Sequence, residues 1–200
     1  MAIAAADVKK LRDKTGVGMA DCKKALEEAG GDEARAIEIL RKHGEAISAK
    51  RADKVANQGL VEAYIHTGGK MGSLIELNCE TDFVAKTEAF QSLARDMAMQ
   101  IVAMQPLYIS KESVPPEIVA SELEIARQTA INEGKPENIL DKIAQGRLEK
   151  FYQEVCLLEQ TYIKDGGKTI RDILNEATAK LGEKLDVRRF SRFQLGEGAQ

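Results

Sequence analysis

Two runs of alternating residues, one on each side of a glycine pair, constrain the fold of this chain more than any other feature. In residues 61–65 and again in residues 73–79, apolar or small side chains alternate with polar or larger ones, and Gly68-Gly69 lies between the runs. A period of two is typical of strands, and paired glycines readily adopt the backbone of a tight turn. The sequence therefore predicts an antiparallel β-hairpin.

The first 44 residues show a helical period instead. Apolar residues recur at helical spacing in three segments that glycines separate: residues 4–15, 19–29 and 32–44. Asp32 can cap the third segment, and Gly44 is expected to end it. Three short helices in residues 1–44 predict a small helical bundle.

Residues 45–57 are rich in Ala, Lys, Arg and Asp and hold too few large apolar side chains to pack against a core. We interpret them as a charged linker, and their composition leaves open whether it is helical. The linker leads into residues 58–200, which begin with the predicted hairpin.

Beyond the hairpin, the pattern predicts four helices and a final strand: helices in residues 82–104, 116–132, 136–155 and 170–181, and a strand in residues 184–195. The third of these helices is expected to bury one side, with Ile139, Ile143, Leu148, Phe151 and Val155 on it. A sheet of three antiparallel strands covered on one face by helices is the economical arrangement. The predicted fold class is α+β, with the three-helix bundle followed by this core.

Two features of the composition indicate where the protein works. The sequence has no run of about 18 apolar residues and no basic flank followed by an apolar block at its start, so we expect a soluble protein. Cys22, Cys79 and Cys156 are odd in number and contain no Cys-x-x-Cys pair. This usage favours reduced thiols and a cytoplasmic location.

The net charge of −3 is spread over interspersed acids and bases. No strong field attracts a polyanion, so direct binding of nucleic acid is not expected. One exception is the segment Arg188–Phe193, in which basic and aromatic residues alternate. An RNA-associated scaffold is therefore the alternative to a strand that merely exposes solvated arginines.

Few side chains offer catalytic chemistry. Metal-ligand spacings and phosphate-binding glycine loops are missing from the sequence, so no metal and no cofactor are expected. Cys79 and His66 are the only thiol and imidazole that could meet, across the predicted hairpin, but strand alternation places them on opposite faces. We expect no enzyme activity, and a cysteine hydrolase is the weaker alternative.

The stretch Glu76–Lys86 ends a strand, turns and opens a helix with Asp82 and Phe83 in the first turn. In one interpretation Phe83 and Phe90, seven positions apart, share the buried face of one helix, and Asp82 only favours the helix N-terminus. In the other, both side chains project beyond the sheet toward a partner. Met19 presents a similar choice between the core of the bundle and an exposed contact.

Two stretches, Leu11–Leu26 and Glu76–Lys86, closely resemble the two sequence motifs of bacterial elongation factor Ts and occur in the order expected for that family. The resemblance covers nearly the whole chain. It implies that residues 1–44 form a ubiquitin-associated-like domain and that residues 58–200 form the core and dimerisation domain.

The resemblance also implies a function. Members of the family are guanine-nucleotide exchange factors that bind elongation factor Tu in its GDP form, disturb the magnesium and phosphate region of its G domain, and leave it nucleotide-free. The contact residues implied for this chain are Arg12, Met19, Asn78, Thr81, Asp82, Phe83 and Val84. Short members lack a coiled-coil insertion and form homodimers, for which Phe190 and Phe193 are contact candidates here.

Overall fold

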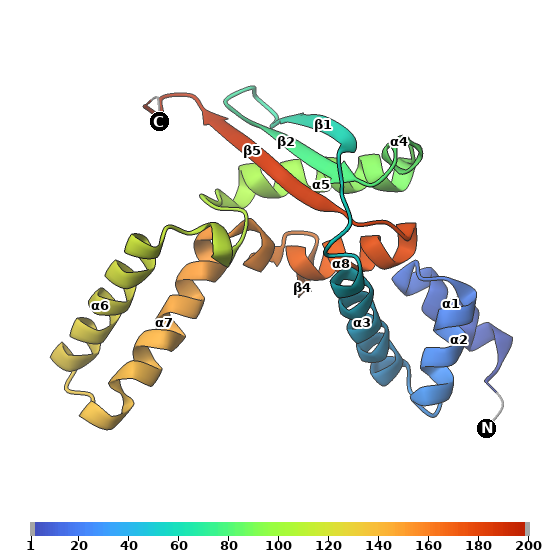
Figure 1. Cartoon of the computed structure of the whole chain (residues 1–200), viewed down its shortest axis with the longest axis horizontal. Coiled ribbons are helices and arrows are strands. Elements are labelled where there is room, and N and C mark those ends of the chain that lie inside the picture. The colour runs from blue at the N-terminus through green and yellow to red at the C-terminus, as the bar shows by residue number, and fades with distance from the viewer. Residues whose placement is uncertain (1–2, 199–200) are drawn as a thin grey trace. The chain divides into compact units, whose positions relative to one another are not determined.

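The computed structural model describes residues 3–198. Its helices are α1 (Ala5–Thr15), α2 (Met19–Glu28), α3 (Glu33–Lys50), α4 (Asp82–Ala85), α5 (Glu88–Met104), α6 (Pro116–Asn132), α7 (Leu140–Val155) and α8 (Ile170–Leu181). Its strands are β1 (Gln58–Ile65), β2 (Met71–Cys79), β3 (Thr161–Tyr162), β4 (Asp165–Thr169) and β5 (Asp186–Gln194). Three short 3-10 helices complete the order shown in Figure 1: η1 (Lys111–Ser113), η2 (Glu137–Ile139) and η3 (Leu157–Glu159).

The chain divides into two compact units. Unit 1 comprises the residues up to Ala63, Leu74–Asp96 and Asp172–Phe190; unit 2 comprises Tyr64–Ser73, Met97–Arg171 and the residues from Ser191 onward. The predicted boundaries at residues 44 and 58 stay a prediction.

Unit 1 begins with the bundle of α1, α2 and α3, as the helical period predicted. Its buried core consists of Val8, Leu11, Cys22, Ala25, Leu26, Ala29, Ala36 and Leu40. Asp32 caps α3 as expected, because its carboxylate accepts a hydrogen bond from the backbone N–H of Arg35 at 3.0 Å.

Helix α3 does not end at Gly44 but continues to Lys50, so that part of the prediction is wrong. A Cβ atom on Gly44 would lie 3.4 Å from the backbone oxygen of Asn175 in α8. Glycine occurs here because it lets two helices approach closely, and the resulting packing outweighs its poor helix propensity.

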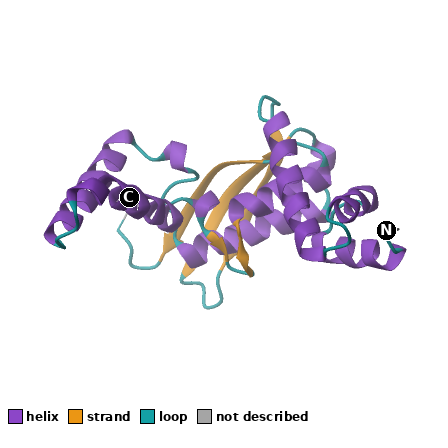
Figure 2. Ribbon diagram, turned by 90° about the horizontal axis from the view of Figure 1, so that it is seen from below, coloured by secondary structure: helices purple, strands orange, loops and turns teal. Residues whose placement is uncertain are grey.

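Strands β1, β2 and β5 form the predicted three-stranded antiparallel sheet, in the order β1-β2-β5. From Ser73 onward the buried residues of β2 are Ser73, Ile75, Leu77 and Cys79, which alternate with more exposed ones, and Gly72 before them is buried as well. Helix α5 runs along one face of the sheet in Figure 1, and Figure 2 shows the strands from another side. The mixture of helices with an antiparallel sheet confirms the α+β class.

Unit 2 contains a hairpin of α6 and α7, which pack side by side (Figure 1). The buried residues of α7 are Leu140, Ala144, Leu148 and Tyr152. The predicted face was right at Leu148, and Phe151 and Val155 are partly buried against the same core, but Ile139 is exposed. The turn η2 holds Ile139 outside the regular helix, so the buried stripe begins one residue later, at Leu140.

A small sheet of β3 and β4, which the sequence did not predict, pairs Thr161 with Thr169 and Tyr162 with Asp165. Beside it, two buried glutamines bond to each other, with the Nε2 of Gln100 donating to the Oε1 of Gln160 at 3.3 Å. The Nε2 of Gln160 donates to the carbonyl oxygens of Met104 at 3.1 Å and Glu154 at 2.8 Å. These bonds satisfy carbonyls that would otherwise be buried without a donor.

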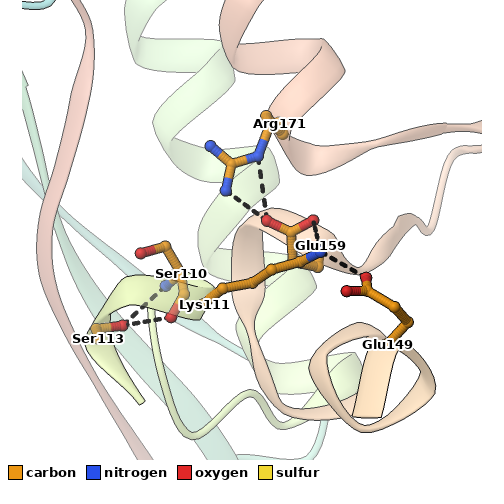
Figure 3. Close-up of polar contacts among 6 residues, drawn as sticks. All are labelled: Ser110, Lys111, Ser113, Glu149, Glu159 and Arg171. Carbon is orange, nitrogen blue, oxygen red and sulfur yellow. Dashed lines mark hydrogen bonds and ion pairs between the residues drawn. The ribbon is translucent and has the colours of Figure 1, made fainter. Parts of the chain in front are cut away.

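A charged cluster joins η1, α7, η3 and the start of α8 (Figure 3). The Nζ of Lys111 lies 2.6 Å from Glu149 and 3.9 Å from Glu159, and Arg171 also pairs with Glu159. The hydrogen bond with Glu149 raises the pKa of Lys111. All four charges have opposite partners, so we interpret the cluster as structural.

Candidate functional site

The turn between β2 and α5 presents one large apolar side chain to solvent. Phe83 has 79% of its surface exposed, although it belongs to helix α4. Thr81 is the N-cap of this helix, and its Oγ1 accepts a hydrogen bond from the backbone N–H of Val84 at 3.5 Å. The exposed ring excludes the interpretation in which Phe83 shares a buried face with Phe90.

The predicted single helix over residues 82–104 is interrupted, and Thr87 provides the physical reason. The hydroxyl of Thr87 donates to the carbonyl of Val84 at 2.7 Å and accepts from the N–H of Phe90 at 3.3 Å. One side chain thus closes α4 and opens α5. The single-helix prediction was wrong, and the break frees Phe83 from the buried stripe that Phe90 begins.

Asp82 lies next to Phe83 and is also exposed. Its carboxylate bonds with the Nζ of Lys86 at 2.7 Å, and this hydrogen bond lowers the pKa of Asp82 below its usual range. The tip of the turn therefore carries an ionised carboxylate, paired with Lys86, beside an apolar ring.

Glu183, between α8 and β5, holds the backbone of this turn. Its Oε2 accepts the N–H groups of Glu80 at 3.1 Å and Thr81 at 3.0 Å, and its Oε1 accepts the Thr81 hydroxyl at 2.6 Å. Three donors converge on one carboxylate, which fixes the two residues that precede the tip.

A second carboxylate, that of Glu80, ties the turn to the end of α3. Its Oε1 accepts from Arg51 at 2.7 Å and from the backbone N–H of Lys184 at 2.6 Å. The N–H of Lys184 is the largest cause that lowers the pKa of Glu80, and the bond from Arg51 adds to it. Asn78 makes a further link, because its Nδ2 donates to the carbonyl of Ala56 at 3.2 Å.

The remaining predicted contact residues lie on the bundle and on the last strand. Arg12 is exposed, and Met19 at the start of α2 has 44% of its surface exposed, so Met19 is not part of the bundle core. On β5, Phe193 is 67% exposed, whereas Phe190 is half-buried.

The thiol and imidazole that sequence reasoning considered together have separate roles. The Sγ of Cys79 is buried and donates to the carbonyl of Thr81 at 3.1 Å, while the Nδ1 of His66 bonds with the hydroxyl of Tyr64 at 3.1 Å. Burial raises the pKa of the Cys79 thiol, and the charge of Glu183 raises it further. A buried thiol with a raised pKa is a poor nucleophile.

Two of the arginines in the basic strand are neutralised by nearby acids. Arg189 pairs with Glu76 at 2.6 Å and Arg192 pairs with Glu197 at 2.7 Å. This arrangement favours an ion-paired strand over a surface for RNA. In residues 3–198, no cluster of His, Cys, Asp and Glu has the arrangement of a metal site, and no helix is long and apolar enough to cross a membrane.

Comparison with known proteins decides the family. A family model described as elongation factor Ts matches residues 4–197. The chain belongs to the elongation factor Ts family.

Curated members of the family are similar over nearly their whole length. Elongation factor Ts of Moorella thermoacetica is 63% identical over 196 residues, which cover 98% of this chain and 97% of the relative. That of Caldanaerobacter subterraneus is 59% identical over 198 residues and 99% of both chains. That of Carboxydothermus hydrogenoformans is 59% identical over 191 residues, 96% of this chain and 88% of the relative. The protein is thus a translation elongation factor.

For this member of the elongation factor Ts family, sequence reasoning missed the two carboxylates that support the tip. Glu183 lies 103 residues from Glu80 along the chain, and no local pattern joins them. The only signal was the position of Glu183 directly after Gly182, where a helix was expected to end. Glu80 was within the predicted motif but was not assigned a role.

Proposed function

We propose that this protein is the guanine-nucleotide exchange factor of elongation factor Tu. It binds the GDP form, opposes the hold of the G domain on magnesium and phosphate, and leaves the nucleotide-free form for GTP to reload. The observation that carries the proposal is the exposed ring of Phe83 beside the ionised Asp82, on a turn whose backbone is fixed by hydrogen bonds.

The chemistry of the tip suits this role. A ring that is 79% exposed to water gains free energy when it leaves water and enters an apolar pocket of the partner. A carboxylate brought near a bound phosphate repels it and attracts the magnesium ion, and both effects weaken the grip on GDP. Asn78 at the end of β2, Thr81 at the cap of α4 and Val84 within α4 are the other proposed contact residues beside the tip.

The energetics require more than one contact. A nucleotide bound at nanomolar strength must be opposed by about 12 kcal/mol, whereas burial of one phenylalanine supplies only about 1.5–3 kcal/mol. Arg12 and Met19, both exposed on the bundle, are the proposed further contacts. Because coupling is reciprocal, a partner that weakens nucleotide binding is itself released when nucleotide returns.

The decisive experiment measures release of a fluorescent GDP analogue from purified elongation factor Tu by stopped flow. Addition of this protein is expected to accelerate release in proportion to its concentration until the rate reaches a plateau. Release that proceeds at the spontaneous rate at every concentration overturns the proposal. A parallel titration with generic RNA tests the scaffold alternative. For that alternative, the affinity for RNA is expected to fall steeply as the salt concentration rises and to be independent of GDP.

We further propose that the protein is a homodimer. Ile65, Phe193 and Leu195 of unit 2 are 67%, 67% and 76% exposed, and Leu195 extends the pairing beyond β5 through a bond from its N–H to the carbonyl of Lys70 at 2.8 Å. Large apolar side chains of this exposure favour burial against a second copy. Within this proposal, residues 1–44 form a partner-contact domain and residues 58–200 form the dimerisation core, with the charged linker 45–57 between them.

The proposed site of action is the cytoplasm. Cys22, Cys79 and Cys156 are all buried and unpaired, which supports a reducing compartment. Neither the proposed exchange nor the proposed dimer requires a cofactor.

A further inference from the structure

The carboxylate of Glu183 bonds with the turn through three donors of the two residues that precede the tip. It accepts two consecutive backbone N–H groups, of Glu80 and Thr81, and the hydroxyl of Thr81, at 2.6–3.1 Å. The same hydroxyl accepts the N–H of Val84 as the N-cap of α4. Glu183 therefore orients the cap from which the helical turn bearing Phe83 starts.

We infer that Glu183 is a positioning residue for nucleotide exchange: its carboxylate holds the β2–α4 turn so that the Asp82–Phe83 tip has one orientation before the partner arrives. The inference rests on the proposed function and assigns that site a residue from outside the sequence motif. Glu183 supports the tip through its hydrogen bonds with Thr81.

A four-residue helix needs such support. Helix α4 has only the residues Asp82–Ala85, and an isolated helical turn of this length is not stable in water. Thr87 ends the helix on one side, so the other side depends on the Thr81 cap and on what holds that cap. Without Glu183 the turn is expected to sample several orientations. The entropy cost of fixing one of them then opposes binding of the partner.

Glu183 is itself fixed in place. It follows Gly182, which has a φ of +73° and donates its N–H to the carbonyl of Thr178 at 2.9 Å at the end of α8. On the other side, the N–H of Lys184 donates to the side chain of Glu80 at 2.6 Å. The two segments therefore exchange hydrogen bonds in both directions, each carboxylate accepting from the backbone of the other.

The test compares Glu183→Ala, Glu183→Gln, Phe83→Ala and the Phe83→Ala/Glu183→Ala double variant in the fluorescent GDP release assay. Glu183→Ala is expected to lower the plateau rate about tenfold, as the loss of preorganisation predicts. Glu183→Gln keeps the length and one acceptor, so it is expected to have a smaller effect. The double variant is expected to be slower than Phe83→Ala by less than the factor lost in Glu183→Ala, because Glu183 acts through the tip and only Asp82 of the tip remains.

Glu45→Gln is the matched control. Glu45 lies on α3 in the linker, outside the proposed partner-contact domain; its partner is Arg41 at 4.0 Å and its side chain is 51% exposed, so the variant makes the same charge change away from the turn. Its plateau rate is expected to equal that of the unmodified protein. Equal thermal unfolding of Glu183→Gln and the unmodified protein shows that the fold is retained even if Glu183→Ala does not fold.

Amide hydrogen exchange of the free protein provides a readout that needs no partner. In the Glu183 variants, the N–H groups of Glu80 and Thr81 are expected to exchange faster, while those in the middle of α5 keep their protection. Unchanged exchange at both amides overturns the positioning role.

The outcomes separate the two proposals. If the unmodified protein does not accelerate GDP release, the proposed function itself fails. If it does accelerate release and Phe83→Ala is slow, but both Glu183 variants reach the full plateau rate, only the positioning role fails. A double variant that is slower than Phe83→Ala by the whole factor lost in Glu183→Ala likewise excludes action through the tip.

Discussion

Phe83 and Phe90 are seven positions apart yet lie in opposite environments, with 79% of the first and none of the second exposed. In one continuous helix, residues at this spacing lie on the same face. Thr87 separates them because its hydroxyl bonds to Val84 on one side and Phe90 on the other. One polar side chain therefore turns what would have been a buried residue into an exposed one.

The two rings are expected to respond oppositely to truncation. Phe83→Ala should leave the free energy of unfolding within about 0.5 kcal/mol of the original, because the ring is exposed, while stimulated GDP release slows strongly. Phe90→Ala should lose about 3–5 kcal/mol of stability through the cavity it creates. Urea unfolding and stopped-flow release measure the two effects. Full stimulation by Phe83→Ala would remove the ring from the proposed site.

The break at Thr87 shows where a local sequence pattern stops predicting the bounds of a helix. The apolar spacing of residues 90–104 correctly predicted α5, although Met104 at its end is 43% exposed. The same helical period was wrongly extended backward through Thr87, although threonine is a recognisable N-cap residue. Gly44 was interpreted as a helix end, because a sequence does not reveal that Asn175 of another helix passes beside it. The hairpin and bundle were predictable because their patterns are short and regular.

The residues that support the tip were harder to predict from the sequence than the tip itself. Asp82 and Phe83 belong to a contiguous motif, and their exposure follows from an adjacent turn. Glu183 and Arg51 reach the same turn from positions 103 and 29 residues away from Glu80. Such contacts depend on how α8 and α3 pack, and this packing has no local signature.

Gly59 is predicted to tolerate no side chain. Its φ is +149°, and an added Cβ would lie 2.2 Å from the carbonyl oxygen of Leu77. Gly59→Ala should therefore destabilise the protein by about 2 kcal/mol or more, since backbone must shift in the hairpin. Gly146→Ala is the control: in α7 with nothing within 4 Å, it should stabilise by about 0.5–1 kcal/mol. Equal midpoints in urea for the two variants would contradict this expectation.

Glu80 is predicted to make stability depend on pH. Because its pKa is lowered in the folded state, its contribution is fully present above about pH 4.3, the usual value for an unfolded glutamate, and is lost as pH falls through the lowered pKa. Glu80→Gln should cost about 1 kcal/mol at pH 7, and the difference from the unmodified protein should shrink below pH 4. Melting temperatures of both proteins across pH 3–7 measure this difference in stability. A difference that grows as the pH falls would contradict the expectation.

The buried glutamine pair is predicted to be important for stability. Gln160→Leu retains the approximate volume but leaves the carbonyls of Met104 and Glu154 without their donor. Buried unsatisfied groups cost about 1–3 kcal/mol each, so a loss of about 3 kcal/mol is expected. Gln128→Leu, at an exposed position whose side chain donates to that of Asn132, should change stability by less than about 0.5 kcal/mol. Similar denaturation midpoints for the two variants would show that water replaces the lost donor.

The proposed dimer makes a prediction about the exposed apolar residues of unit 2. Phe193→Asp places a charge where a second copy would bury a ring, so sedimentation velocity should show a monomer, while circular dichroism and unfolding remain unchanged because Phe193 is 67% exposed. Leu107→Asp introduces the same charge at a residue that is 61% exposed outside the sheet, and should leave the dimer intact. If the unmodified protein sediments as a monomer at assay concentrations, Ile65, Phe193 and Leu195 face solvent in the working protein and exchange must be performed by one copy.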